Sequence, residues 1–212
     1  MSTVARVCVL AAVALAAAAG AHARAAWTVG IKGGPCMATL RGDDAGGAGT
    51  RTSFGGGAFA EGEFSENVSL RVEGLFLGKG ASFHDADQDE ELSLDYFEIP
   101  ILFVLQLPVS LETTLSAFAG PAIGLNMGAE YESTFGTSTV TEDVDDQFSN
   151  VDLGLVLGAG VNVAVRSIVI GLDARFDLGL TGVGEDDLPG QEQQVKNRAW
   201  LVMASLGFPV SQ

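Results

Sequence analysis

The chain has 212 residues, of which 47% are hydrophobic, and its 27 acidic and 11 basic residues give a net charge of −16. This acidic balance disfavours a nucleic-acid partner, because contact with phosphates needs a basic surface. No segment after residue 25 has 18 uninterrupted apolar residues, which disfavours a helical membrane protein.

Residues 1–25 predict a secretory signal peptide, with Arg6 in a positive n-region and an apolar core that follows it. The short, Ala-rich core disfavours the alternative, a transmembrane anchor. Residues 26–212 are then expected to form one exported domain that begins near Ala26. Cys8 falls in the leader, so Cys36 has no partner for an intrachain disulfide.

The clearest pattern lies between Val151 and Leu180, where two alternating runs flank a two-residue break at Arg166 and Ser167. Strict period-2 alternation over ten or more residues indicates a β-strand, because successive side chains point to opposite sides. Runs of this length match the roughly 9–11 tilted residues that cross a bilayer. One face is bulky and apolar (Leu153, Leu155, Leu157, Ile170, Leu172, Phe176), and the other is small or charged (Gly154, Gly158, Asp173, Arg175, Asp177).

Similar runs with turn residues between them predict an all-β fold, a closed antiparallel up-and-down transmembrane β-barrel of about eight strands. Connections are short after the second, fourth and sixth strands and long after the others, as expected for short periplasmic turns and long extracellular loops. The long ones include an acidic loop over 81–91 and a polar loop over 131–149. The expected strands are 27–36, 53–64, 68–80, 93–107, 113–130, 153–165, 168–180 and 197–210.

Aromatic residues near the strand ends predict the two interfacial girdles of a membrane barrel. A soluble lipocalin-like barrel that binds a small apolar ligand is the alternative, with the apolar faces turned inward. The small, weakly charged polar faces favour the membrane, because a water-facing surface should be rich in Lys and Glu. The inner girdle would comprise Trp27, Phe64 and Phe208, and the outer one Phe83, Tyr96, Tyr131, Phe148 and Trp200.

Several ordered motifs resemble those of the PorT-like outer-membrane β-barrel proteins. The resemblance implies an eight-stranded outer-membrane barrel without an assigned activity, in a family whose namesake is linked to a secretion system. The chain departs from such barrels at its end, which reads Pro209-Val210-Ser211-Gln212 where an aromatic residue is expected. The motifs are Val29-Gly30-Ile31-Lys32-Gly33-Gly34, Leu94-Asp95-Tyr96-Phe97-Glu98-Ile99-Pro100, Phe118-Ala119-Gly120-Pro121, Gly158-Ala159-Gly160-Val161, Leu172-Asp173-Ala174-Arg175-Phe176, Gly179-Leu180 and Lys196-Asn197-Arg198.

Charged residues on the polar faces are expected to point into the lumen. An eight-stranded barrel is just wide enough for side chains to fill it, and buried charges must be paired. The pattern therefore predicts a salt-bridge plug, with an ion path as the alternative. The predicted interior charge network comprises Lys32, Arg71, Glu73, Glu98, Asp173, Arg175 and Asp177, and Glu61 and Lys79 share its faces.

The acidic loop contains weak candidates for loose divalent-cation binding. The spacing resembles the start of a calcium loop, but Glu90 and Tyr96 stand where Gly and Glu are required. His84 and Ser82 lie close together, yet no oriented Ser–His–acid set is indicated, so no catalysis is inferred. No cofactor is expected. The candidate ligands are Asp85, Asp87, Asp89 and Glu90.

Two prolines fall inside predicted strands. Pro lacks the N–H that a β-ladder needs, and a closed barrel has no free edge. Folding the hairpin about Ser110 brings Pro100 opposite Gly120 and Pro121, which predicts a bulge there. The alternative is that each proline sits where its strand has no inward hydrogen bond to make.

These features together predict a small integral protein of the bacterial outer membrane with acidic extracellular loops and a structural or surface-interaction role. We expect a monomer in contact with outer-membrane lipid, with the barrel-insertion machinery during biogenesis, and with an envelope protein partner.

Overall fold

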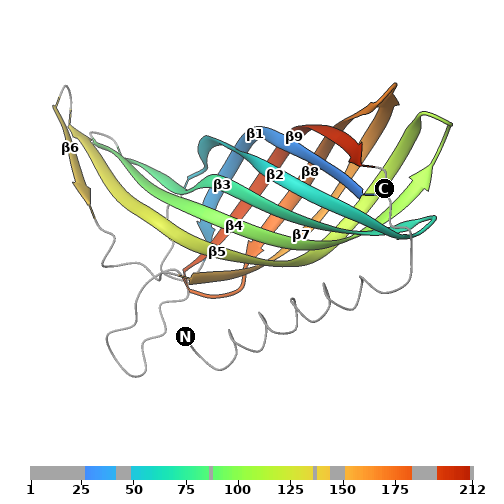
Figure 1. The fold of residues 1–212 in the computed structure, drawn as a ribbon. Coiled ribbons are helices and arrows are strands. Elements are labelled where there is room, and N and C mark those ends of the chain that lie inside the picture. Colours follow the sequence, from blue (N-terminus) through green and yellow to red (C-terminus); the bar gives the residue numbers. More distant parts are fainter. Residues whose placement is uncertain are drawn as a thin grey trace.

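The computed structural model describes residues 27–41, 49–85, 88–135, 138–143, 151–182 and 195–210. Eight long strands in these ranges form a closed antiparallel ring (Figure 1). The first strand pairs with the last, so that Trp27 lies opposite Val210 and the sheet has no edge within the ring. The predicted closed barrel of eight strands is confirmed, whereas the predicted leader lies outside the described residues. The ring comprises β1 (Trp27–Arg41), β2 (Arg51–Ser65), β3 (Val68–Asp85), β4 (Gln88–Pro108), β5 (Thr113–Phe135), β7 (Val151–Val165), β8 (Ile168–Gly179) and β9 (Lys196–Val210).

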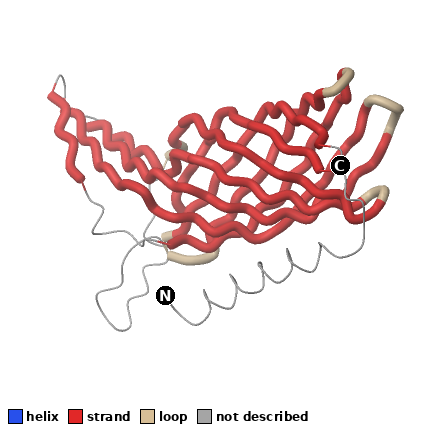
Figure 2. The backbone as a smooth tube through the Cα atoms, in the orientation of Figure 1, coloured by secondary structure: helices blue, strands red, loops and turns tan. Residues whose placement is uncertain are grey.

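A ninth strand, β6 (Ser138–Asp143), stands outside the ring and pairs only with the end of β5 among the described residues. The ends of β3, β4 and β5 also run past the ring, and Figures 1 and 2 show them with β6 as a sheet projecting from one end. We call this part, residues 81–85, 88–92, 130–135 and 138–143, the outer extension. The predicted loops over 81–91 and 131–149 are therefore wrong where these strands continue. Beyond the lipid, water meets both faces of the sheet, so the chain loses its apolar alternation.

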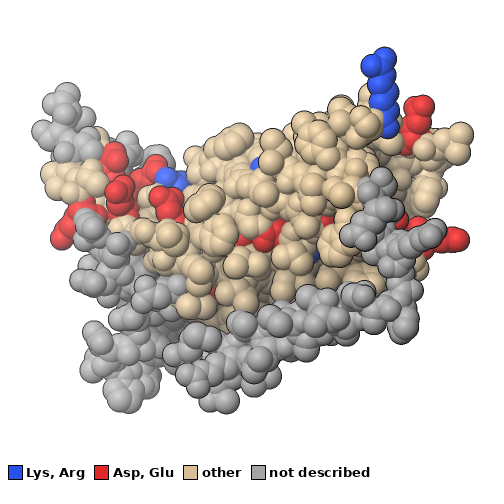
Figure 3. Space-filling view, viewed as in Figure 1, with Lys and Arg blue, Asp and Glu red and all other residues tan. Residues whose placement is uncertain are grey.

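The apolar faces of the strands point outward. Leu172 is 52% exposed whereas its neighbour Asp173 is only 7% exposed, and Leu153 and Phe176 lie on the same face as Leu172. Figure 3 shows a nearly uncharged band around the middle of the visible surface, with acidic side chains gathered toward both ends. This arrangement fits lipid contact and contradicts the lipocalin-like alternative, which needs the apolar faces inside. No helix in the described ranges is long and apolar enough to cross a membrane.

The aromatic girdles are partly as predicted. The outward-facing Trp27, Phe64, Phe208 and Trp200 are all exposed at 44–55%. Tyr96 was wrongly placed in the outer girdle, since it is 2% exposed and points into the lumen. Its even position in β4 puts it on the inward face with Glu98. Phe83 and Tyr131 also pack against an apolar cluster at the outer mouth, and Phe148 lies outside the described residues.

Three apolar clusters fill the lumen at different levels. The outer mouth, the end of the barrel from which the outer extension projects, contains a cluster around Leu40, Leu92 and Leu94. A second cluster joins β1, β3 and β9 and includes Leu75 and Leu201, both fully buried. A third lies between β4, β5 and β7 and comprises Leu102, Val104, Phe118, Ala122 and Val156.

The bulge predicted at the prolines is wrong. Pro100 faces Ala122 and Phe103 faces Ala119, so the register of β4 on β5 is the same on both sides of the intervening residues. The ladder from β5 to β7 also runs through Pro121 without a shift. The register changes instead nearer the outer end, between Asp95 and Tyr96. The irregular pairing expected there is nevertheless present. Ile101 and Leu102 have no partners on β5, and Ile99 and Pro100 have none on β3, although both ladders resume in the same register.

Gly80 marks the point where β3 leaves the ring. Its φ of 120° is in the region that favours glycine, and a Cβ there would lie 2.0 Å from the carbonyl oxygen of Leu92. The close approach of β4 therefore depends on the absence of a side chain at this position.

Candidate functional site

The centre of the lumen holds an ion-paired cluster supplied by β1, β3 and β8. Lys32 Nζ donates to Glu73 Oε1 and to Asp173 Oδ2, each at 2.8 Å. Arg175 Nη1 donates to Glu73 Oε2 at 2.6 Å, and its Nε lies 3.8 Å from Asp177 Oδ1. All five residues are buried, so their inward positions follow from the period-2 alternation of their strands. The structure brings these predicted residues together as one network.

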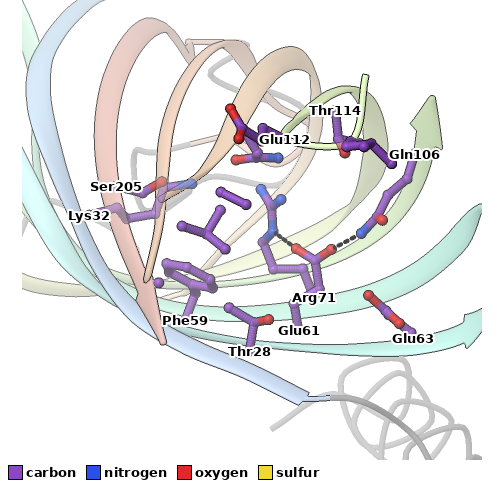
Figure 4. A pocket seen from close by; sticks show the side chains of 15 residues that line it. Thr28, Lys32, Phe59, Glu61, Glu63, Arg71, Gln106, Glu112, Thr114 and Ser205 are labelled. Carbon is purple, nitrogen blue, oxygen red and sulfur yellow. Dashed lines mark hydrogen bonds and ion pairs between the residues drawn. The ribbon is translucent and has the colours of Figure 1, made fainter. Parts of the chain in front are cut away.

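A second ion pair lies nearer the end of the barrel that carries the β4–β5 turn. Arg71 Nε donates to Glu61 Oε2 at 2.6 Å, and Ser69 Oγ and Gln106 Nε2 donate to Glu61 Oε1 at 2.6 and 2.7 Å. The guanidinium of Arg71 also lies 5.7 Å from the centroid of the Phe59 ring, within the range of a cation–π contact. Figure 4 shows Arg71, Glu61 and Gln106 joined in this way from neighbouring strands. The Glu61 carboxylate is thus held by three donors.

A third polar group lies in the outer half of the lumen. Lys79 Nζ donates to Glu98 Oε2 in a short ion pair. Asp152 accepts hydrogen bonds from Thr181 Oγ1 at 2.7 Å and from Asn197 Nδ2 at 3.2 Å. Sequence reasoning did not assign Asp152 or Asn197 to the interior, although Asp152 is one alternation step before Gly154, which it placed on the small or charged face.

The buried charges inside the barrel do not balance. Among the described residues, six acidic and four basic residues are buried, which leaves two more negative than positive formal charges. Neutral donors such as Thr181 and Asn197 stabilise part of this excess, and a proton or cation bound in the lumen would offset it, because a buried unpaired charge costs several kcal/mol. The acidic ones are Glu61, Glu73, Glu98, Asp152, Asp173 and Asp177, and the basic ones Lys32, Arg71, Lys79 and Arg175.

A cavity of about 180 Å³ opens beside the second ion pair, at the end of the barrel that carries the β4–β5 turn. Leu111 and Glu112 of this turn form part of its rim, while Lys32, Arg71 and Phe59 line it further in (Figure 4). The central cluster and the apolar layers lie between this cavity and the outer mouth. The cavity is therefore a vestibule at one end of a filled lumen.

Of the four candidate cation ligands of the acidic segment, only the side chain of Glu90 lies within the described structure. Asp87 lies outside the described residues, and so do the side chains of Asp85 and Asp89. The hydrogen bond between Tyr131 and Glu90 raises the pKa of the Tyr131 phenol to about 12. Within the described ranges, no three His, Cys, Asp or Glu side chains are placed to hold a metal ion.

Solved structures of outer-membrane proteins resemble this fold. A major outer membrane protein from Thermus thermophilus superimposes with a TM-score of 0.52 at 13% identity, covering 89% of this chain and 100% of that one. Neisserial surface protein A gives 0.49 at 14% identity, covering 87% and 97%. Ail, the attachment invasion locus protein of Yersinia pestis, gives 0.42 at 14% identity, covering 85% and 98%. Only the Thermus thermophilus protein has a TM-score above 0.5, and at 13% identity this likeness concerns the fold alone.

The sequence itself identifies the family. No curated protein sequence matches the chain. The model of the outer membrane protein beta-barrel domain matches residues 18–184, which is most of the chain. This match agrees with the closed ring, the outward apolar belt and the charged interior. The chain belongs to the outer membrane protein beta-barrel domain family and is a small integral protein of the bacterial outer membrane.

Proposed function

We propose that this protein is a plugged, non-catalytic barrel that anchors the outer extension above the membrane as a surface for interaction. The observation that carries the proposal is the filled lumen, in which ion pairs and apolar clusters alternate from the vestibule to the outer mouth. The Lys and Arg side chains inside the barrel form ion pairs with carboxylates, so they serve to pack and neutralise the interior. A projecting sheet with exposed Glu91, Glu130, Glu132 and Glu142 supplies the acidic surface.

The resemblance of the ordered motifs to PorT-like proteins supports a closer relationship to that family within the outer-membrane barrels. It also supports an envelope protein as the partner of the outer extension. Because the barrel has no open edge, we propose that it acts as a monomer.

The experiment that tests the plug is conductance across a planar lipid bilayer. Purified protein, whose insertion is verified by protease protection of the strands, should give no current steps above the leak of the lipid alone. An open porin in the same bilayer serves as the positive control. Steady current steps from the wild-type protein would favour the ion path and contradict the plug.

A further inference from the structure

A small chamber lies in the outer half of the lumen, between the walls formed by β4, β7 and β8. Its volume is about 10 Å³, which is close to the minimum for one water molecule. Three carboxyl side chains and one amine line it. They belong to Glu98, Asp152, Asp177 and Lys79.

Several carboxylate oxygens around this chamber lack a hydrogen-bond donor. Asp177 is 4% exposed, yet neither of its carboxylate oxygens has a hydrogen-bond donor, and Glu98 Oε1 also has none. Both carboxyl groups line the same chamber, and ionised carboxylates can only accept hydrogen bonds, so neither group can supply the donor that the other lacks. Two ionised carboxylates in contact inside a protein repel each other, and their unsatisfied oxygens add a desolvation cost.

The neighbouring charges do not remove this conflict. Lys79 donates to the other oxygen of Glu98, and Arg175 is bonded to Glu73 and lies 3.8 Å from Asp177. Asp152 adds a third carboxyl group from β7. Asn197 on β9 donates to Asp152 and to the hydroxyl of Tyr96 on β4, and Cys36 on β1 is the other titratable group near Asp177.

The size of the chamber decides which positive species can enter. A hydrated metal ion does not fit in about 10 Å³, and no three carboxylate, His or Cys side chains in the described ranges are arranged to strip and hold one. A proton needs no additional volume and converts one carboxyl group into the missing donor.

We propose that Glu98 and Asp177 bind one proton between them, as a carboxylic acid that donates to a carboxylate across the lumen. The two residues come from β4 and β8, which are separated in the ring by β5 and β7. The shared proton therefore ties together two strands that do not pair with each other. It also offsets half of the excess negative charge of the interior.

The bound proton links the stability of the barrel to pH. The native state holds a proton that the two carboxyl groups of the unfolded chain release at neutral pH. The native state then binds more protons than the unfolded state, so stability falls as pH rises, by up to about tenfold in the unfolding equilibrium constant per pH unit. The fall ends once the native pair has lost its proton.

The first test is infrared spectroscopy of the full-length protein in lipid vesicles at neutral pH. The wild-type protein should show the carbonyl stretch of a protonated carboxylic acid, with a downshift in D2O. The band should be lost in both Asp177→Asn and Glu98→Gln, because each removes one member of the pair. It should persist in Asp95→Asn, which changes an exposed aspartate on the outward face of β4. Absence of the band in the wild type, or its persistence in both variants, would overturn the proposal.

The second test is urea unfolding in vesicles over a range of pH. Asp177→Asn replaces the proton by an amide N–H, which can donate to Glu98 at any pH. This variant should lose the pH dependence and be more stable than the wild type at alkaline pH, while Asp95→Asn should behave as the wild type does. If Asp177→Asn does not fold, Glu98→Gln takes its place, with the same expected loss of pH dependence. A stability of the wild type that depends on Na⁺ at constant pH and ionic strength would identify a metal ion instead and contradict the proposal.

Discussion

The guanidinium of Arg175 has no exposed surface and lies between carboxylates from two strands. It donates to Glu73 at 2.6 Å, and its Nη2 lies 3.1 Å from the sulfur of Met203. In such a position, one cation compensates several acidic groups, and its loss leaves them buried without a partner. The contribution of such a residue to the free energy of unfolding is best measured by replacing it with a residue that has no charge.

Replacement of Arg175 by Ala should lower the free energy of unfolding by about 3–5 kcal/mol, because Glu73 and Asp177 lose a partner while they stay buried. Equilibrium urea unfolding in lipid vesicles measures the change. Arg198→Ala is a matched control at an exposed position of β9 and should change the value by less than about 0.5 kcal/mol. Equal midpoints for the wild type and Arg175→Ala would mean that the carboxylates find other compensation.

The inward position of Arg175 could be predicted from the sequence, but its partner could not. Alternation along β8 assigns each residue to a face from local information alone. The bond to Glu73 joins residues 102 positions apart. Which pair meets across the lumen depends on the stagger of the strands after closure, which no local pattern encodes. For the same reason, Leu75 and Leu77 look misplaced on a polar face, although they form part of an apolar layer inside.

At the scale of the elements, β4 and β5 continue well beyond the apolar belt. The outward side chains of β4 are apolar from Leu107 back to Phe97 and become charged at Asp95. This length matches the roughly 9–11 residues of a membrane-crossing strand. Alternation in the sequence reveals only the part of a strand that lies in lipid. The outer extension is ordered by pairing between strands, without such alternation, so the sequence predicts a loop there.

The contact between Tyr131 on β5 and Glu90 on β4 reports whether the outer extension stays paired in solution. Tyr96 is the only other tyrosine, so Tyr96→Phe isolates the Tyr131 signal. In that background, ultraviolet titration should give Tyr131 a pKa of about 12. Glu90→Gln should bring it toward the ordinary value of about 10, because the neighbouring carboxylate no longer opposes phenolate formation. A titration near 10 in both proteins would show that the two strands separate there.

At the scale of the whole molecule, the two tryptophans mark the two boundaries of the belt. Trp27 begins β1 at the end of the barrel that carries the β4–β5 turn, and Trp200 pairs with Met37 ten residues further along that strand. Trp200 also packs on Phe176 with ring centroids 4.8 Å apart. Aromatic residues at these heights are typical of barrel interfaces with the headgroup region.

Brominated lipids test this orientation in proteins with one tryptophan, obtained as Trp27→Phe and Trp200→Phe. Both remaining tryptophans should be quenched more strongly by bromine near the headgroup than by bromine near the chain end. We expect this quenching because Trp27 is 44% exposed and Trp200 is 55% exposed on the outward face, where lipid can reach them. Stronger quenching from the chain ends would place the barrel differently in the membrane, and no quenching would contradict a membrane position.

The pairing of β1 with β9 has a consequence for assembly. It joins Trp27 to Val210, so the last seam can form only when nearly the whole chain is present. Bringing distant segments together lowers the entropy of the chain before the contacts between them stabilise it. Long-range strand pairing is therefore slow. Until β9 joins them, β1 and β8 each have an unpaired edge. In the hydrocarbon core of the membrane, each unpaired backbone amide on such an edge costs several kcal/mol. A ribosome stalled before Lys196 would therefore release a sheet that cannot close, and its open edges would make it a substrate for proteolysis or aggregation.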